Sequence, residues 1–189
     1  MGTIKTTNIQ TITGSGTLTL GTSGETLALG SGVTSNLMYP AFMATMGTSN
    51  QNVTSATKTK VQLTNEVIDT DNAFDNSTNY RFTVPSGGAG KYLINGAVTL
   101  RSTSTSTVEV VYAYLYKNGS ELNVSMAVFN NNPIQISTQN FSVLVDLVAG
   151  DYIELFGYVQ ASSGTPAFDP GVSSDATKST YLAGLRIGT

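Results

Sequence analysis

The chain has 189 residues, with 9 basic and 12 acidic side chains, a net charge of −3, and no Cys, His or Trp. The absent residue types exclude zinc fingers, catalytic thiols, Ser-His-Asp triads and haem ligands of the usual kinds. The negative charge argues against a nucleic-acid partner, and the apolar runs are too short for a membrane span.

Residues 1–36 consist of short bursts, a few residues each, in which apolar and polar residues alternate, and glycines separate these bursts. The stretches 18–24 and 27–32 both begin Leu-x-Leu-Gly. Such bursts predict short strands and turns. Each burst has too few apolar side chains to offset an ordering entropy of about 1–2 kcal/mol per residue. We therefore expect the segment to be buried against other copies of itself or against a partner protein, through Leu18, Leu20, Leu27 and Leu29.

Residues 38–189 form a second domain made of successive strands. The alternation of apolar and polar residues predicts strands at 60–63, 80–84, 91–100, 108–116, 122–129, 134–136, 141–147, 152–160 and 180–187. Asn118-Gly119 predicts a two-residue hairpin with a type I′ turn. Because no long stretch has the 3.6-residue period of a helix, the sequence predicts an all-β sandwich.

The predicted strands at residues 108–116 and 152–160 are apolar on both faces. Aromatic rings alternate along one face of each strand, and Val, Ile, Leu or Ala alternate along the other. A sandwich has only one interior, so the aromatic face must contact a subunit or a ligand. Aromatic rings serve both purposes, and stacking of a sugar is the alternative to subunit contact. We predict that these side chains form a subunit interface: Tyr112, Tyr114, Tyr116, Phe156 and Tyr158.

Without His or Cys, a catalytic or metal site would depend largely on carboxylates. Asp69-Thr70-Asp71 begins like a calcium loop, but Phe74 stands where such a loop needs Gly, and no bidentate Glu follows. We interpret the two aspartates as turn formers. Glu109 and Glu154 are a formal glycosidase pair, but a small sandwich rarely offers the cleft that a glycosidase needs. We expect no enzymatic activity, no metal and no cofactor.

Several motifs in the second domain resemble the globular-head family of the first complement component's q subunit, which shares its jelly roll with tumour necrosis factor. These motifs, in order, are Tyr80-Arg81-Phe82-Thr83-Val84-Pro85, Gly90-Lys91-Tyr92-Leu93-Ile94, Leu115-Tyr116-Lys117-Asn118-Gly119, residues 147–153 and residues 179–185. The resemblance covers roughly residues 40–188. It implies a jelly roll of about ten strands that assembles as a tight homotrimer and binds ligands without catalysis.

The sequence Gly-Ser-Gly-Thr-Leu-Thr-Leu-Gly-Thr-Ser-Gly-Glu at residues 14–25 is similar to the N-terminal segments of tailed-phage virion proteins, tail fibres especially. This second resemblance implies a protein of the phage particle, on the tail or the capsid surface. A short Gly/Thr-rich β-stalk or anchor, residues 1–37, would dock on another virion protein. A trimeric knob, residues 38–189, would recognise a glycan or protein on the host surface.

Two alternatives stay open at this point. One is a capsid decoration protein that stabilises the head, and the other is a free lectin-like module, which the absence of a secretory signal disfavours. If the knob binds a host ligand, we expect the contacts in two polar connections, residues 130–132 and 162–174, because binding residues concentrate in loops on a rigid scaffold. The ligand-facing residues predicted there are Asn131, Phe168 and Asp169.

Overall fold

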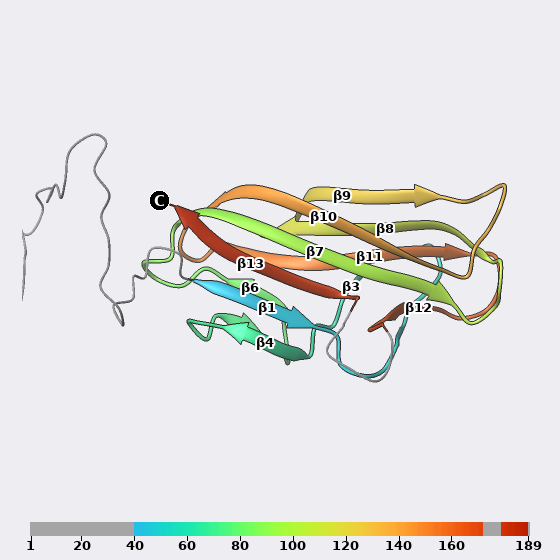
Figure 1. The fold of residues 1–189 in the computed structure, drawn as a ribbon, viewed down its shortest axis with the longest axis horizontal. Helices are drawn as coiled ribbons and strands as arrows, with labels where there is room; N and C mark the ends of the chain where they lie inside the picture. Colours follow the sequence, from blue (N-terminus) through green and yellow to red (C-terminus); the bar gives the residue numbers. More distant parts are fainter. Residues whose placement is uncertain (1–39, 172–178, 189) are drawn as a thin grey trace, which may run out of the picture. The chain divides into compact units, whose positions relative to one another are not determined.

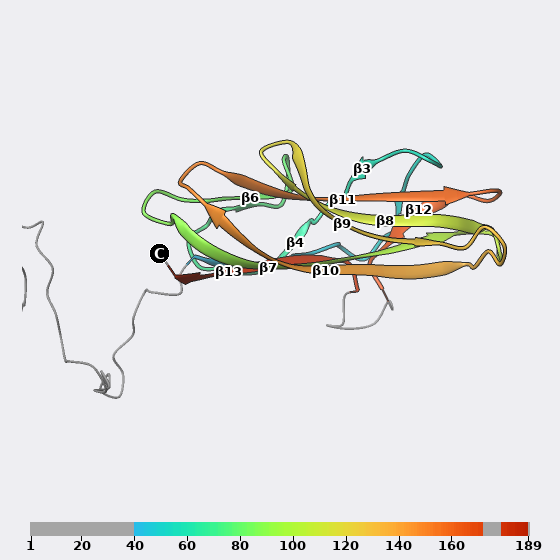
Figure 2. The same ribbon diagram turned by 90° about the horizontal axis from the view of Figure 1, so that it is seen from above.

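The structure is a computed structural model that describes residues 40–171 and 179–188. These residues form two β-sheets packed face to face, without a helix among them (Figures 1 and 2). The prediction of an all-β jelly-roll sandwich is thereby confirmed. The predicted anchor with its four leucines, and the predicted domain boundary at residues 37 and 38, lie outside the described residues. Within the described part, no helix is long and apolar enough to cross a membrane.

Sheet A has seven strands arranged around the long strand β7. The strands are β1 (Ala41–Thr45), β2 (Gln51–Asn52), β4 (Asn65–Asp69), β7 (Gly90–Ser102), β10 (Ile136–Leu147), β12 (Pro166–Asp169) and β13 (Tyr181–Gly188). β10 pairs with β7 along nearly its whole length, whereas β13 and then β12 share its other edge. β1 and β4 follow β13, and β2 follows β12.

Sheet B has six strands in the order β5-β6-β11-β8-β9, and β3 pairs with β11 beyond β6. The strands are β3 (Thr59–Lys60), β5 (Phe74–Asp75), β6 (Arg81–Thr83), β8 (Val108–Lys117), β9 (Ser120–Val128) and β11 (Tyr152–Ala161). The β8–β9 hairpin turns at Asn118 and Gly119, whose φ angles of 52° and 76° confirm the predicted type I′ turn.

The core lies between the sheets and is built from alternate residues of the long strands. Fully buried side chains include Ile94 and Leu100 of β7 and Leu115 of β8, and the rings of Phe42 and Phe82 stack at a centroid distance of 4.2 Å. Gly157 provides room for a ring from the other sheet, because a Cβ there would lie 2.6 Å from the ring of Phe168. Glycine in a strand interior marks such a close approach.

Two of the sequence motifs, residues 115–119 and 147–153, form one hydrogen-bonded unit around Asp151. Lys117 Nζ lies 2.8 Å from the Asp151 carboxylate, Asn118 Nδ2 donates to it at 2.7 Å, and the Val148 N–H donates at 2.9 Å. Burial alone would raise the pKa of Asp151, but the hydrogen bonds from Lys117, Asn118 and Val148 outweigh it and lower the pKa to about 2. The motif residues are therefore structural.

Replacing Asp151 by asparagine is expected to lower the free energy of unfolding by about 2 kcal/mol at pH 7. The folded-state pKa lies below the unfolded value, so this stabilisation is fully present above about pH 4. It is lost as the pH falls through about 2. Thermal unfolding of both proteins between pH 2 and 7, at one protein concentration, measures the difference. The control is Asp146→Asn, at an exposed carboxylate, which should change stability by less than about 0.5 kcal/mol. A difference that does not depend on pH would contradict the role given to Asp151.

Candidate functional site

The five aromatic side chains predicted to form an interface lie together on the outer face of sheet B. The alternate residues of β8 and β11 are fully buried in the core, so the rings point away from it, as the alternation predicted. Neighbouring rings contact one another in a continuous row, with centroid distances of 5.1 Å for Tyr158–Tyr112, 5.5 Å for Tyr112–Tyr114, 6.4 Å for Tyr114–Tyr116 and 4.4 Å for Tyr116–Phe156. We call this set the aromatic row.

Part of the aromatic row is already covered within one chain. Lys58 Nζ lies 4.1 Å from the centroid of the Tyr114 ring and pairs with Glu121 of β9 at 2.8 Å. Tyr114 is only 8% exposed, and burial raises the pKa of its hydroxyl. Lys60 lies over Phe156 and pairs with Glu154. Cation–π contacts of this kind stabilise the subunit itself. The role of the aromatic row between subunits stays a prediction.

Among the described residues, no charged side chain stands on the central part of the outer face of sheet A, where β1, β7, β10 and β13 pair. The residues of β1, β7, β10 and β13 that alternate with core residues point outward there. These residues are Ala41, Met43, Thr45, Leu93, Asn95, Ala97, Thr99, Thr138, Asn140, Ser142, Leu144, Tyr181, Ala183 and Leu185. On these described strands the charged side chains stand at the two ends, with Lys91 and Asp146 paired at 3.5 Å at one end and Arg101 paired with Asp169 at the other.

The edge of the sandwich next to this face is also apolar. β9 and β10 lie along the same edge (Figure 1). Leu144 of β10 is 67% exposed on the outer face of sheet A. Val124 and Met126 of β9 pair with Tyr114 and Tyr112, so the exposed β9 side chains point to the outer face of sheet B, beside the aromatic row. Four of these β9 side chains are 40–56% exposed: Leu122, Val124, Met126 and Val128. A monomer rarely exposes contiguous apolar surface of this kind without a partner.

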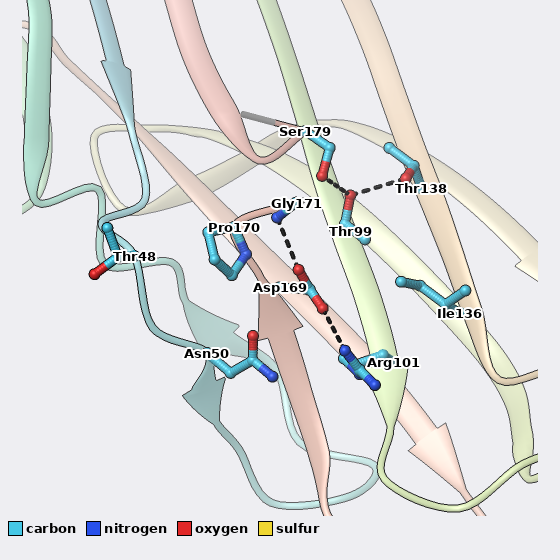
Figure 3. A pocket seen from close by; sticks show the side chains of 10 residues that line it. All are labelled: Thr48, Asn50, Thr99, Arg101, Ile136, Thr138, Asp169, Pro170, Gly171 and Ser179. Carbon is cyan, nitrogen blue, oxygen red and sulfur yellow. Dashed lines mark hydrogen bonds and ion pairs between the residues drawn. The ribbon is translucent and has the colours of Figure 1, made fainter. Parts of the chain in front are cut away.

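A polar groove lies on sheet A at its charged Arg101 end, with a volume of about 600 Å³ (Figure 3). The ion pair between Arg101 of β7 and Asp169 of β12, at 2.7 Å, lies at its centre. Thr99 and Thr138 form one wall, where their hydroxyls are hydrogen bonded at 2.8 Å. The opposite wall comes from the segment after β1 and includes Asn50.

The groove contains one of the three residues predicted to face a ligand. Asp169 lines it, although its carboxylate is mostly buried and accepts hydrogen bonds from Arg101 and from the Gly171 N–H at 2.7 Å. The prediction for Phe168 is wrong: its side chain is 0% exposed and fills the space above Gly157, because residues 166–169 form strand β12 and not a loop. Asn131 is exposed in the β9–β10 connection and does not line the groove.

Of the other carboxylates considered in the sequence, Asp69 acts in a turn, and Glu109 and Glu154 lie far from each other. Asp69 accepts the N–H groups of Asp71 and Phe74 at 3.2 and 2.7 Å, which confirms its role in a turn. The register of β8 and β11 places Glu154 opposite Tyr116, about 20 Å along the strands from Glu109, so they cannot act as a glycosidase pair. In the parts of the chain that the structure describes, no cluster of acidic side chains is arranged to hold a metal ion.

No protein-family model matches the sequence, and no curated protein matches it either. Among solved structures, the chain is similar to the Eiger TNF of S. frugiperda, with a TM-score of 0.56, 11% identity, and coverage of 80% of this chain and 94% of that one. For murine APRIL the TM-score is 0.52 at 12% identity, covering 78% and 98%. For the globular domain of zebrafish complement 1qA it is 0.49 at 13% identity, covering 79% and 98%.

The fold is therefore a two-sheet jelly roll of the C1q/TNF type, as the motifs in residues 80–185 implied. At these identities the similarity establishes the fold alone. The similarity of the first 36 residues to phage virion segments receives no support from these comparisons and stays a prediction.

Proposed function

We propose that the protein is the homotrimeric knob-bearing component of a phage virion appendage, whose knob binds a ligand on the host surface. The observation that carries this proposal is the uncharged outer face of sheet A beside the apolar β9–β10 edge. In the described part of the chain, the outward residues of β10 on this face and the four apolar side chains of β9 are exposed, and the two surfaces fit each other in character. A trimer in which the edge of one subunit lies on the face of the next would bury both.

This contact is heterologous, because it joins two different patches of the same chain. Such contacts generate closed rings when the rotation between subunits closes, and a ring of three uses every edge and every face once. Obligate interfaces commonly bury thousands of Å² and are apolar at their centre. The charged residues Lys91 and Arg101 at the ends of the face would lie at the rim, where they stay solvated.

Attachment to the particle is assigned to the first 36 residues. They resemble virion segments and have strand alternation with too few apolar side chains for one chain to fold alone. Three copies held together by a trimeric knob would bring three sets of leucines to high local concentration. The chain enters the described part at Pro40, whose carbonyl accepts the Arg186 N–H at 3.0 Å, near the end of β13. The groove lies on the half of the sandwich that carries β12, away from that end (Figure 1).

Deleting residues 1–36 is expected to leave a folded, soluble trimer that no longer associates with phage particles. The measurement is co-sedimentation with particles together with light scattering of the purified protein. Loss of the trimer on deletion would place the segment in the assembly core, and normal incorporation would place attachment elsewhere. Imaging of labelled particles tests the appendage role, because label on the head and not on the tail would identify a capsid decoration protein instead.

A further inference from the structure

The groove on sheet A has the chemistry of a site for a neutral, hydroxyl-rich ligand. Its lining side chains are mainly hydroxyls and amides, from Thr48, Asn50, Thr99, Thr138 and Ser179. Its charged residues, Arg101 and Asp169, neutralise each other in an ion pair. A groove of this volume falls within the range that small-molecule sites occupy.

The Arg101 guanidinium has donor capacity that the protein does not use. One terminal nitrogen donates to Asp169, whereas the buried Nε–H has no partner among the described residues. The Nε atom is not accessible from the groove, but the side chain as a whole is 32% exposed, so its remaining terminal N–H groups can donate to a ligand oxygen. Asp169 holds the guanidinium in place, since its second oxygen is fixed by the Gly171 N–H (Figure 3).

The rest of the groove offers contacts of the kinds that a sugar ring requires. Asn50 and Thr138 are exposed on opposite walls, and their amide and hydroxyl groups both donate and accept hydrogen bonds. Ile136 and Pro170 add two apolar surfaces against which the C–H groups of a ring would pack. Because the lining is neutral as a whole, an anionic ligand would gain no net attraction there.

We infer that this groove binds a neutral saccharide of one or two rings, with Arg101, Asn50 and Thr138 making the polar contacts. The inference rests on the proposed function of the knob as a binding module and names the chemical class of its ligand. It places the site in the groove formed by β7, β10 and β12 and not on the aromatic row.

The test is saturation-transfer NMR on the purified full-length protein, with D-glucose, D-galactose and N-acetyl-D-glucosamine as neutral probes and D-glucuronate as a charged one. At least one neutral sugar should receive saturation from the protein, more strongly than glucuronate. The double variant Asn50→Ala/Thr138→Val should weaken its affinity at least tenfold. Both residues are exposed, so the fold should persist. Arg101→Lys keeps the charge but replaces the planar fork of terminal N–H donors by one ammonium group, and should weaken binding in the same way.

The matched control is Thr165→Val, an exposed threonine that does not line the groove, which should bind as the unmodified protein does. Absence of saturation transfer to every neutral sugar, stronger binding of glucuronate, or unchanged affinity in the double variant would each overturn the inference. The measurement uses no particles, so its failure is distinguishable from failure of virion attachment, which co-sedimentation reports.

Discussion

Replacing Leu144 by arginine is expected to convert the protein from a homotrimer to a monomer of 19.8 kDa. Leu144 is 67% exposed and lies on β10, where the uncharged face of sheet A meets the sandwich edge. In the proposed trimer its side chain is buried, and an unpaired charge there costs several kcal/mol in each of three contacts. In a monomer the same side chain is solvated, so the subunit should stay folded. Light scattering and circular dichroism measure the two properties separately.

Two further variants make this experiment specific. Val148→Arg changes another apolar residue, 63% exposed, in the turn after β10, and should leave the trimer intact. Tyr158→Arg places the same charge on the aromatic row. Dissociation by Tyr158→Arg but not by Leu144→Arg would assign the interface to the aromatic row and contradict the interface proposed above. A monomeric unmodified protein at micromolar concentration would contradict the trimer itself.

Replacing Phe168 by alanine is expected to lower the free energy of unfolding by about 3–5 kcal/mol, the cost of removing a fully buried ring. The ring packs over Gly157, and nothing else can fill that space without movement of β12 or β11. Chemical denaturation of both proteins measures the difference. The control Val148→Ala, at an exposed site, should change stability by less than about 0.5 kcal/mol. Unchanged stability together with weakened ligand binding would instead support the sequence-based expectation that Phe168 faces a ligand.

The long strands were predictable because their signal is local. Alternation over eight or more residues marks β7, β8, β11 and β13, and the Asn118-Gly119 pair identifies the hairpin by its need for positive φ. The alternation also showed that the aromatic row lies opposite the core. β10 was predicted as two pieces, at residues 134–136 and 141–147, because the polar residues between them weaken the pattern, although pairing with β7 keeps the strand continuous.

The groove could be predicted only in part. Asp169 was identified from its place in a polar connection, but Arg101, Asn50 and Thr138 were missed, since no motif joins them. Arg101 and Asp169 are 68 residues apart in the chain, and they meet because β12 pairs with β7. Gly157, like Gly96 and Gly184, lies in the interior of a strand, which is a local signal that a bulky residue approaches from elsewhere.

The sequence by itself determined the class of fold, the sidedness of its strands and the turn at Asn118, because these depend on residues close together in the chain. The tertiary structure decided which apolar surfaces stay uncovered, where Phe168 lies and which polar groups share a groove. Lys58 covers Tyr114 because the segment before β3 runs along β11. On the outer face of sheet A, Thr45, Ala97 and Thr99 are buried, whereas the outward residues of β10 are exposed. Contacts between distant segments depend on the register and packing of whole strands, which no local pattern of residues encodes.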